Sequence, residues 1–237
     1  MKKKEKKYLK KFKDYENLIV LLIGSSITSQ EWCHPNWHDW MEYTFRQDEN
    51  WDKAWKRKII NTARDGASIS HYLNNFDTEI LRFKPDLVIE SLGVNSIIPD
   101  LDEAKTQKEI YELNKRILGE GFELATWSYQ LGSATYDERM KRLRDIHKEL
   151  ALELNYQFVD IYEEFKKYDL SKIFMFIHPW QNKPWGMKPG DVDFLHCNEV
   201  GNQIIAEKLL KELFDKEINR DEFGTMKLLD LTKYIIH

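Results

Sequence analysis

Short apolar segments alternate with longer amphipathic segments along this chain, and this alternation restricts the possible folds more than any other feature of the sequence. The apolar segments have the length and composition of buried strands. The amphipathic segments repeat apolar residues every three or four positions, as helices that cover a sheet do. Strands that alternate with helices form a mostly parallel sheet with helices on both faces. We therefore predict a three-layer α/β/α fold, with strands near residues 18–23, 57–63, 87–92, 122–128 and 156–161 and helices near 30–47, 68–83, 102–118, 136–154 and 198–216.

The length of 237 residues predicts one domain with a short segment at each end. A composition with 42% hydrophobic and 13% aromatic residues is typical of a folded core. We assign residues 1–16 to a basic lead-in segment, 17–216 to the domain and 217–237 to a C-terminal extension. This extension either packs on the domain or mediates self-association, so a homo-oligomer is one expected possibility.

Charge is distributed unevenly along the chain. The first thirteen residues hold eight lysines and one glutamate, although the whole chain has a net charge of −4. The remainder is therefore acidic, which argues against nucleic acid as a partner because phosphate binding needs a basic face on the fold. The lysines could touch an anionic membrane surface or another polyanion. Because Tyr8, Leu9 and Phe12 give this segment only a weak apolar stripe, we favour a solvated helix.

The sequence predicts a soluble, cytoplasmic protein. No segment has the length of a membrane span. The apolar run at 18–23 is short for a signal peptide, and no cleavage site follows it before Ser26. Two cysteines, Cys33 and Cys197, make no disulfide framework, and we expect both to be reduced.

Four short motifs lie where the predicted fold would bring them together. Gly24-Ser25-Ser26 follows the first strand, 61–66 ends the second in Asp-Gly, Gly93-Val94-Asn95 follows the third, and Asp193-Phe-Leu-His196 precedes the last helix. Singly, each is an ordinary turn, cap or loop pair. However, the carboxyl ends of parallel strands meet at one edge of a sheet, where ligands bind. A helix is predicted over 30–47, with Pro35 in its first turn. Ser26 would lie near the start of this helix, beside the exposed backbone N–H groups of its first turn.

These four motifs resemble the blocks of the SGNH (GDSL-type) hydrolase family, which carry a Ser, a Gly, an Asn and an Asp-x-x-His in this order. The resemblance spans about residues 18–214 and implies a flavodoxin-like five-stranded sheet and an esterase or lipase activity. Two positions depart from the family pattern. Ser25 stands where the family usually has Asp, and Ser96 replaces the Asp that usually follows the Asn. We infer altered hydrogen bonding around an unchanged reaction.

The resemblance implies a role for each residue of the motifs. Ser26 would be the nucleophile, His196 the base that takes its proton, and Asp193 the carboxylate that orients the imidazole. The backbone N–H groups of Ser26 and Gly66 and the side-chain amide of Asn95 would form the oxyanion hole. Among the other histidines, His178 is the only serious rival base, and it lacks a nearby carboxylate in the sequence.

We predict no metal and no cofactor. The chain has no phosphate-binding glycine loop and no dinucleotide motif. Cys33, His34 and His38 are metal-ligand types, but no second ligand cluster accompanies them, and packing or surface exposure explains both histidines.

The expected substrate is a small-molecule or carbohydrate ester, with acetyl as the favoured acyl group. Residues 174–193 contain three prolines, and we interpret them as a long insertion that shapes the site. Two alternatives remain, which are an O-acyltransferase that uses the same serine and a non-catalytic carbohydrate-binding protein. An aromatic-lined cleft would suit a sugar or an acyl group, although at least half of the tryptophans are expected to be core or loop anchors; the candidates are Trp32, Trp37, Trp40, Trp127, Tyr129, Trp180 and Trp185.

Overall fold

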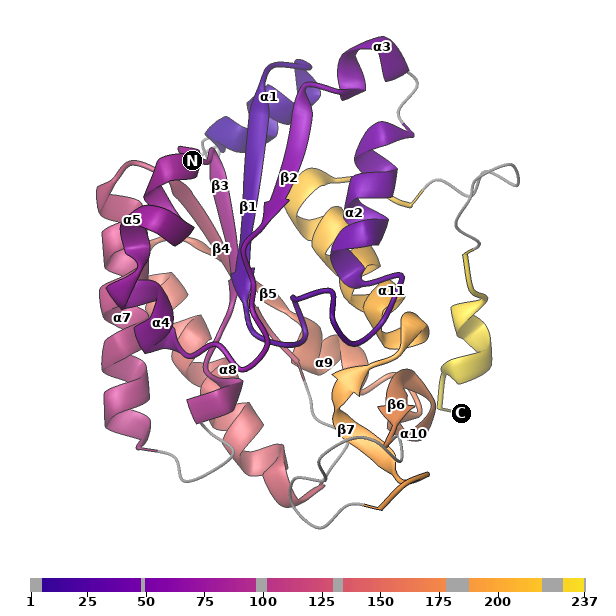
Figure 1. The fold of residues 1–237 in the computed structure, drawn as a ribbon. Coiled ribbons are helices and arrows are strands. Elements are labelled where there is room, and N and C mark those ends of the chain that lie inside the picture. The colour runs from indigo at the N-terminus through magenta and orange to yellow at the C-terminus, as the bar shows by residue number, and fades with distance from the viewer. Residues whose placement is uncertain are drawn as a thin grey trace.

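A sheet of five parallel strands forms the centre of the protein (Figure 1). The computed structural model describes residues 6–47, 50–96, 102–129, 134–177, 188–218 and 228–236. The strand order β2-β1-β3-β4-β5 is the flavodoxin-like order, and it confirms the predicted fold class. All five predicted strands form, within a few residues of the expected bounds: β1 (Leu18–Gly24), β2 (Arg57–Asn61), β3 (Leu87–Ser91), β4 (Glu123–Ser128) and β5 (Gln157–Asp160).

Helices cover both faces of the sheet and complete the three layers. On one side stand α4 (Ile69–Asn74), α7 (Glu103–Gly119) and α8 (Ala134–Leu154), and on the other α2 (Trp37–Arg46) and α11 (Glu199–Leu209) (Figure 1). Strands β1 and β3 are almost completely buried, because helices lie on both of their faces. The shorter helical elements are α1 (Lys7–Lys13), α3 (Trp51–Ala54), α5 (Phe76–Glu79), α9 (Ile161–Phe165), α10 (Leu170–Ile173), the 3-10 turns Leu81–Phe83 and Leu231–Tyr234, and a π-helical turn at Leu210–Phe214.

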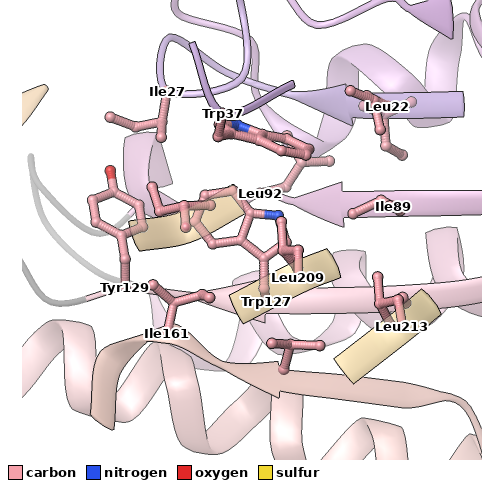
Figure 2. Close-up of a cluster of buried hydrophobic side chains, with 14 of the residues drawn as sticks. Leu22, Ile27, Trp37, Ile89, Leu92, Trp127, Tyr129, Ile161, Leu209 and Leu213 are labelled. Carbon is pink, nitrogen blue, oxygen red and sulfur yellow. The ribbon is translucent and has the colours of Figure 1, made fainter. Parts of the chain in front are cut away.

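Large aromatic side chains fill the core between the sheet and the layer of α2 and α11. Figure 2 shows Trp37 and Trp127 among aliphatic side chains of the strands and of α11. Their rings meet edge to face, with centroids 5.6 Å apart. Burial of such large rings supplies much of the hydrophobic stabilisation of this side of the sheet.

The lysine-rich N-terminal segment forms a helix, as predicted, but this helix packs on the domain. Tyr8 and Phe12 of α1 are only 1% and 2% exposed. The Tyr8 hydroxyl donates to Gln157 and to the backbone carbonyl of Leu213, and the ring of Phe12 contacts Phe45 and Phe214. The expectation of a solvated lead-in is therefore wrong for this helix, because two large aromatic anchors suffice to bury one face of a seven-residue helix.

Three local predictions need correction. The helix expected from residue 30 starts only at Trp37, and Pro35 precedes it. The helix expected over 68–83 is divided into α4, α5 and a 3-10 turn. The stretch that carries Asp193 and His196, where no strand was predicted, is a strand, β7 (Val192–Cys197), which pairs antiparallel with β6 (Phe174–Phe176).

Part of the C-terminal extension packs on the domain in the region that the structure describes. Ile236 N donates to the Lys167 carbonyl, and Asp169 N donates to the Tyr234 carbonyl. The side chain of Gln203 in α11 forms hydrogen bonds with both backbone groups of Leu229. Within the described ranges, no helix combines the length and the apolar character that crossing a bilayer requires.

Candidate active site

Ser26 lies in a tight turn directly after β1. The carbonyl of Ser25 accepts hydrogen bonds from Thr28 N and Ser29 N, at 3.0 and 2.9 Å, and Ser26 is 4% exposed. Thr28 folds back over the end of the strand, where a Cβ added to Gly24 would lie 2.5 Å from Thr28 Oγ1. Only glycine leaves room for this turn. The serine is therefore held by a turn, and the helix that follows it begins only at Trp37, eleven residues later.

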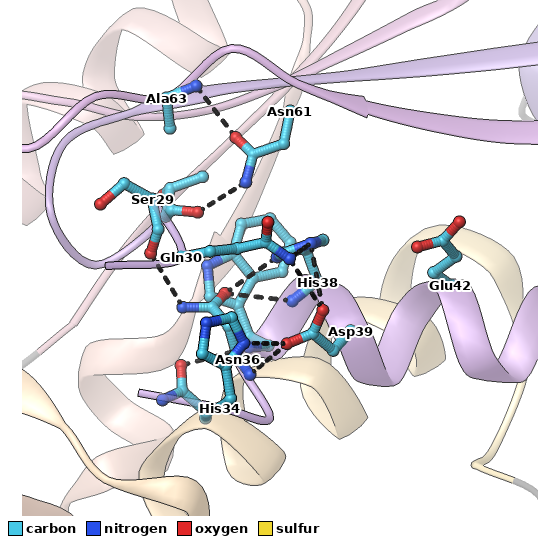
Figure 3. A network of polar contacts seen from close by, with 12 residues as sticks. Ser29, Gln30, His34, Asn36, His38, Asp39, Glu42, Asn61 and Ala63 are labelled. Atoms are coloured by element: carbon cyan, nitrogen blue, oxygen red, sulfur yellow. Dashed lines mark hydrogen bonds and ion pairs between the residues drawn. The ribbon is translucent and has the colours of Figure 1, made fainter. Parts of the chain in front are cut away.

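A polar network fixes the turn between Ser26 and α2 (Figure 3). The side-chain amide of Asn36 donates to the carbonyls of Ile27 and Ser29, and Asn61 donates to the carbonyl of Thr28. Asn36 also caps α2 in a capping box with Asp39, which explains why the helix begins at this point. The two amides satisfy carbonyls that a loop would otherwise leave unpaired.

Asp193 and His196 form a hydrogen-bonded pair on β7. Asp193 Oδ2 lies 2.7 Å from His196 Nδ1, and the two residues are 3% and 7% exposed. Residues three apart on a regular strand face opposite sides. Here the pairing jumps from Met175 with Asp193 to Phe174 with Cys197, so the strand bulges over residues 194–196.

The carboxylate of Asp193 also stabilises the bulge from inside. Asp193 Oδ1 accepts hydrogen bonds from Leu195 N at 3.0 Å and His196 N at 3.3 Å. One oxygen therefore shapes the backbone, and the other orients the imidazole. With Nδ1–H donated to the carboxylate, Nε2 is left as the atom that can accept a proton.

Ser26 and His196 line one small pocket. The indole of Trp32 lies flat against the His196 ring, with centroids 3.8 Å apart and planes 7° apart. Its Nε1 donates to Asp65 Oδ1 at 3.2 Å, which ties the indole to the loop of Gly66. Among the described residues, no hydrogen bond joins the Ser26 hydroxyl to the imidazole. The pocket is lined by Ser26, Ile27, Trp32, Cys33, Asn36, His196, Cys197 and Asn202.

The two other predicted oxyanion-hole residues lie on neighbouring loops that contact each other. Gly66 follows β2 with φ +69°, a conformation that favours glycine. Asn95 follows β3, and its side-chain Nδ2 donates to the carbonyl of Ala67 at 3.1 Å. An amide nitrogen carries two hydrogens, so this bond leaves one hydrogen for another acceptor. Gly66 and Asn95 are thus linked through Ala67.

Most of the other aromatic candidates belong to the core. Trp37, Trp40, Trp127 and Tyr129 are at most 1% exposed, so they do not line a cleft, whereas the half-buried Trp32 does. Residues 178–187, with His178, Trp180 and Trp185, lie outside the described residues.

The candidate metal residues have other surroundings. His34 is exposed, and the buried His38 contacts Gln30 and Asn36 (Figure 3). Burial lowers the pKa of His38 and raises that of Cys33 to about 11. In the ranges that the structure describes, no three histidine, cysteine or acidic side chains gather as metal ligands would.

Two residues that support the site were not predicted from the sequence. The Tyr72 hydroxyl in α4 donates to the Gly24 carbonyl at 2.8 Å and accepts from Gly24 N at 3.1 Å, which holds the end of β1. Asn202 in α11 accepts from Trp37 N and donates to the Cys197 carbonyl, so it joins β7 to the helix after the serine turn. A polar residue on a buried helix face is the only signal that could have indicated either.

Comparison with known proteins identifies the family. The family profile of GDSL-like lipases and acylhydrolases matches residues 22–204, which include all four motifs. The chain belongs to this family. It is accordingly an enzyme that hydrolyses carboxylic esters, and the resemblance found in the motifs is confirmed. No curated protein sequence matches the chain.

Solved structures share the fold of this GDSL-like protein. An acetyl xylan esterase, AlAXEase, is 19% identical with a TM-score of 0.67, and the match covers 83% of this chain and 100% of that one. An acetylxylan esterase from Geobacillus stearothermophilus is 16% identical with a TM-score of 0.69, over 87% of this chain and 98% of that one. A lipase/acylhydrolase from Enterococcus faecalis is 19% identical with a TM-score of 0.64, over 84% and 96%.

Proposed function

We propose that this protein is a serine esterase that removes a small acyl group, such as acetyl, from a carbohydrate. Ser26, His196 and Asp193 act as its catalytic triad, and the reaction passes through an acyl-enzyme. The observation that carries the proposal is the buried Asp193–His196 hydrogen bond beside a pocket that Ser26 also lines. The proposal is also supported by the esterase from Geobacillus stearothermophilus, whose catalytic mutants replace a serine, an aspartate and a histidine, the last two being three residues apart.

Proton transfer follows from the arrangement of the pair. The Ser26 hydroxyl attacks the acyl carbon while His196 Nε2 takes its proton, and Asp193 stabilises the imidazolium that forms. His196 then returns the proton to the oxygen of the leaving alcohol. In the second half, His196 takes a proton from the water that attacks the acyl-enzyme. It then gives this proton to Ser26 Oγ as the acyl–oxygen bond breaks, which releases the acid and regenerates the Ser26 hydroxyl. The hydroxyl and the imidazole come into hydrogen-bonding contact when substrate binds.

The negative charge on the carbonyl oxygen is stabilised by three donors. These are the backbone N–H groups of Ser26 and Gly66 and the second hydrogen of the Asn95 amide. Loss of one such donor typically lowers kcat by about 10²- to 10³-fold. Because the Asn95 side chain is already fixed by Ala67, it needs little reorganisation when the charge develops.

The size of the pocket favours a small acyl group. Its cavity volume is about 10 Å³, far below the roughly 300–1,000 Å³ of sites that hold a drug-sized ligand. The carbohydrate part of the proposal is supported by Trp32, whose half-buried ring borders the pocket, since aromatic rings bind the apolar faces of sugars. Two of the similar structures are acetyl xylan esterases.

The decisive test uses a fluorophosphonate probe together with acetylated xylan and 4-nitrophenyl acetate as substrates. We expect the probe to label Ser26 in the wild type, and labelling and hydrolysis to disappear in Ser26→Ala and His196→Ala. Ser25→Ala is the matched control, because it removes the neighbouring hydroxyl and leaves Ser26 in place. Labelling elsewhere, or an active Ser26→Ala variant, would contradict the assignment. No acetate release from acetylated xylan by a wild type that hydrolyses the nitrophenyl ester would argue against the carbohydrate substrate.

A further inference from the structure

Two ionisable side chains outside the four motifs are completely buried at the end of β3. Glu90 in β3 and His147 in α8 are both 0% exposed. Their facing atoms, Glu90 Oε2 and His147 Nδ1, lie 3.6 Å apart. Because burial disfavours the charged carboxylate, the pKa of Glu90 is raised. An apolar side chain would fill the same volume without this desolvation cost, so the pair needs another explanation.

Both side chains bind the backbone of the same residue, Leu92. Glu90 Oε1 accepts from Leu92 N at 2.7 Å, and His147 Nε2 lies 3.0 Å from the Leu92 carbonyl oxygen. A carbonyl can only accept, so Nε2 carries a hydrogen and donates it. The strand ends at Ser91, and from there two side chains replace the sheet as partners of the backbone.

Leu92 leads directly into the loop of Asn95. The next residue, Gly93, has φ +106°, and its carbonyl accepts a hydrogen bond from Ser96 N. Leu143 of α8, one helical turn before His147, packs against this glycine, where an added Cβ would lie 2.6 Å from Leu143 Cδ1. The loop is therefore fixed by α8 at two successive positions, through the Leu92 carbonyl and at Gly93.

We propose that Glu90 and His147 are positioning residues, which hold the loop 92–95 so that Asn95 donates to the reacting carbonyl oxygen. This inference rests on the proposed function. An oxyanion donor acts only when it is placed before the reaction, to within a fraction of an ångström. The hydrogen bond from Asn95 to Ala67 fixes the end of the side chain, and the contacts to Leu92 fix the backbone from which it extends.

The test is a double-mutant cycle between Glu90→Leu and Asn95→Ala, read as kcat and KM for 4-nitrophenyl acetate. We expect Glu90→Leu to lower kcat about tenfold or more and to change KM less than threefold. On the Asn95→Ala background, the same substitution is expected to lower kcat less than threefold further, because the donor that Glu90 positions is already lost. Glu90→Gln is the matched control. Its amide oxygen still accepts from Leu92 N and its nitrogen can donate to His147 Nδ1, so we expect kcat within threefold of the wild type.

The outcomes separate the two proposals. Equal kcat losses from Glu90→Leu in both backgrounds, or no loss in either, would overturn the positioning role while the wild type stays active. A wild type that neither hydrolyses esters nor reacts with the fluorophosphonate would overturn the proposed function, and the positioning role with it. Should Glu90→Leu fail to fold by circular dichroism, the cycle is run with His147→Leu, which removes the contact to the Leu92 carbonyl and is read in the same way.

Discussion

Replacement of Asp193 by asparagine tests the proposed triad most directly. One carboxylate oxygen accepts from two backbone N–H groups, of Leu195 and His196, and the other accepts from His196 Nδ1. Asparagine has one acceptor oxygen, and that oxygen satisfies more donors when it faces the two backbone groups. The amide nitrogen then donates to Nδ1, which moves the ring hydrogen to Nε2. An imidazole in this tautomer cannot take the proton of Ser26.

The expected loss in kcat is about 10⁴-fold, as for the same exchange in serine proteases, which is about 5.5 kcal/mol of transition-state stabilisation. We expect KM to change little, because Asp193 is buried behind the imidazole. The assay is steady-state hydrolysis of 4-nitrophenyl acetate, with circular dichroism to verify folding. Asp191→Asn, at an exposed position of the same hairpin, is the control. A kcat within tenfold of the wild type for Asp193→Asn would refute the assignment of Asp193.

Two further substitutions test the surroundings of the pair and of the serine turn. Trp32→Leu removes the stacking on His196 and the hydrogen bond to Asp65, so we expect kcat/KM to fall about tenfold, which is about 1.4 kcal/mol. Trp55→Leu, at an exposed position, is the control and should leave kcat/KM unchanged. Equal effects of the two substitutions would contradict a specific role of Trp32 at the active site. Gly24→Ala places a Cβ against Thr28 and should lower stability by about 1–3 kcal/mol in urea unfolding. Gly119→Ala, where nothing lies within 4 Å of an added Cβ, is its control, and equal midpoints would contradict the close-approach argument.

The sheet could be predicted because buried parallel strands have a direct signature. β1 and β3 lie under helices on both faces, so the apolar runs at 18–23 and 87–92 are nearly continuous. That Ser26, Gly66 and Asn95 follow three neighbouring parallel strands could be predicted from the strand ends. The pairing of Asp193 with His196 could be predicted from their spacing and from the family resemblance.

Features that depend on distant partners could not be predicted. β7 was not predicted because the bulge changes which side its residues face. Its polar and apolar residues therefore do not alternate as they do in a regular strand. The start of the helix at 30–47 was placed too early, because Trp32 and Cys33 look like part of an amphipathic helix, whereas the capping box of Asn36 with Asp39 starts α2 later. Glu90 is visible as an ionisable residue in an apolar run, but nothing in the sequence connects it to His147.

The bulge in β7 has a consequence for how this region can change in evolution. The two residues between Asp193 and His196 are paired with nothing on β6, and their number sets the length of the bulge. Deletion of one would shorten the bulge without removing it and would change the direction of the imidazole relative to the carboxylate. Insertion of one would separate the two backbone amides from the carboxylate that gathers them. We therefore expect related sequences to keep the spacer length unchanged and to keep an apolar residue at the buried position of Leu195.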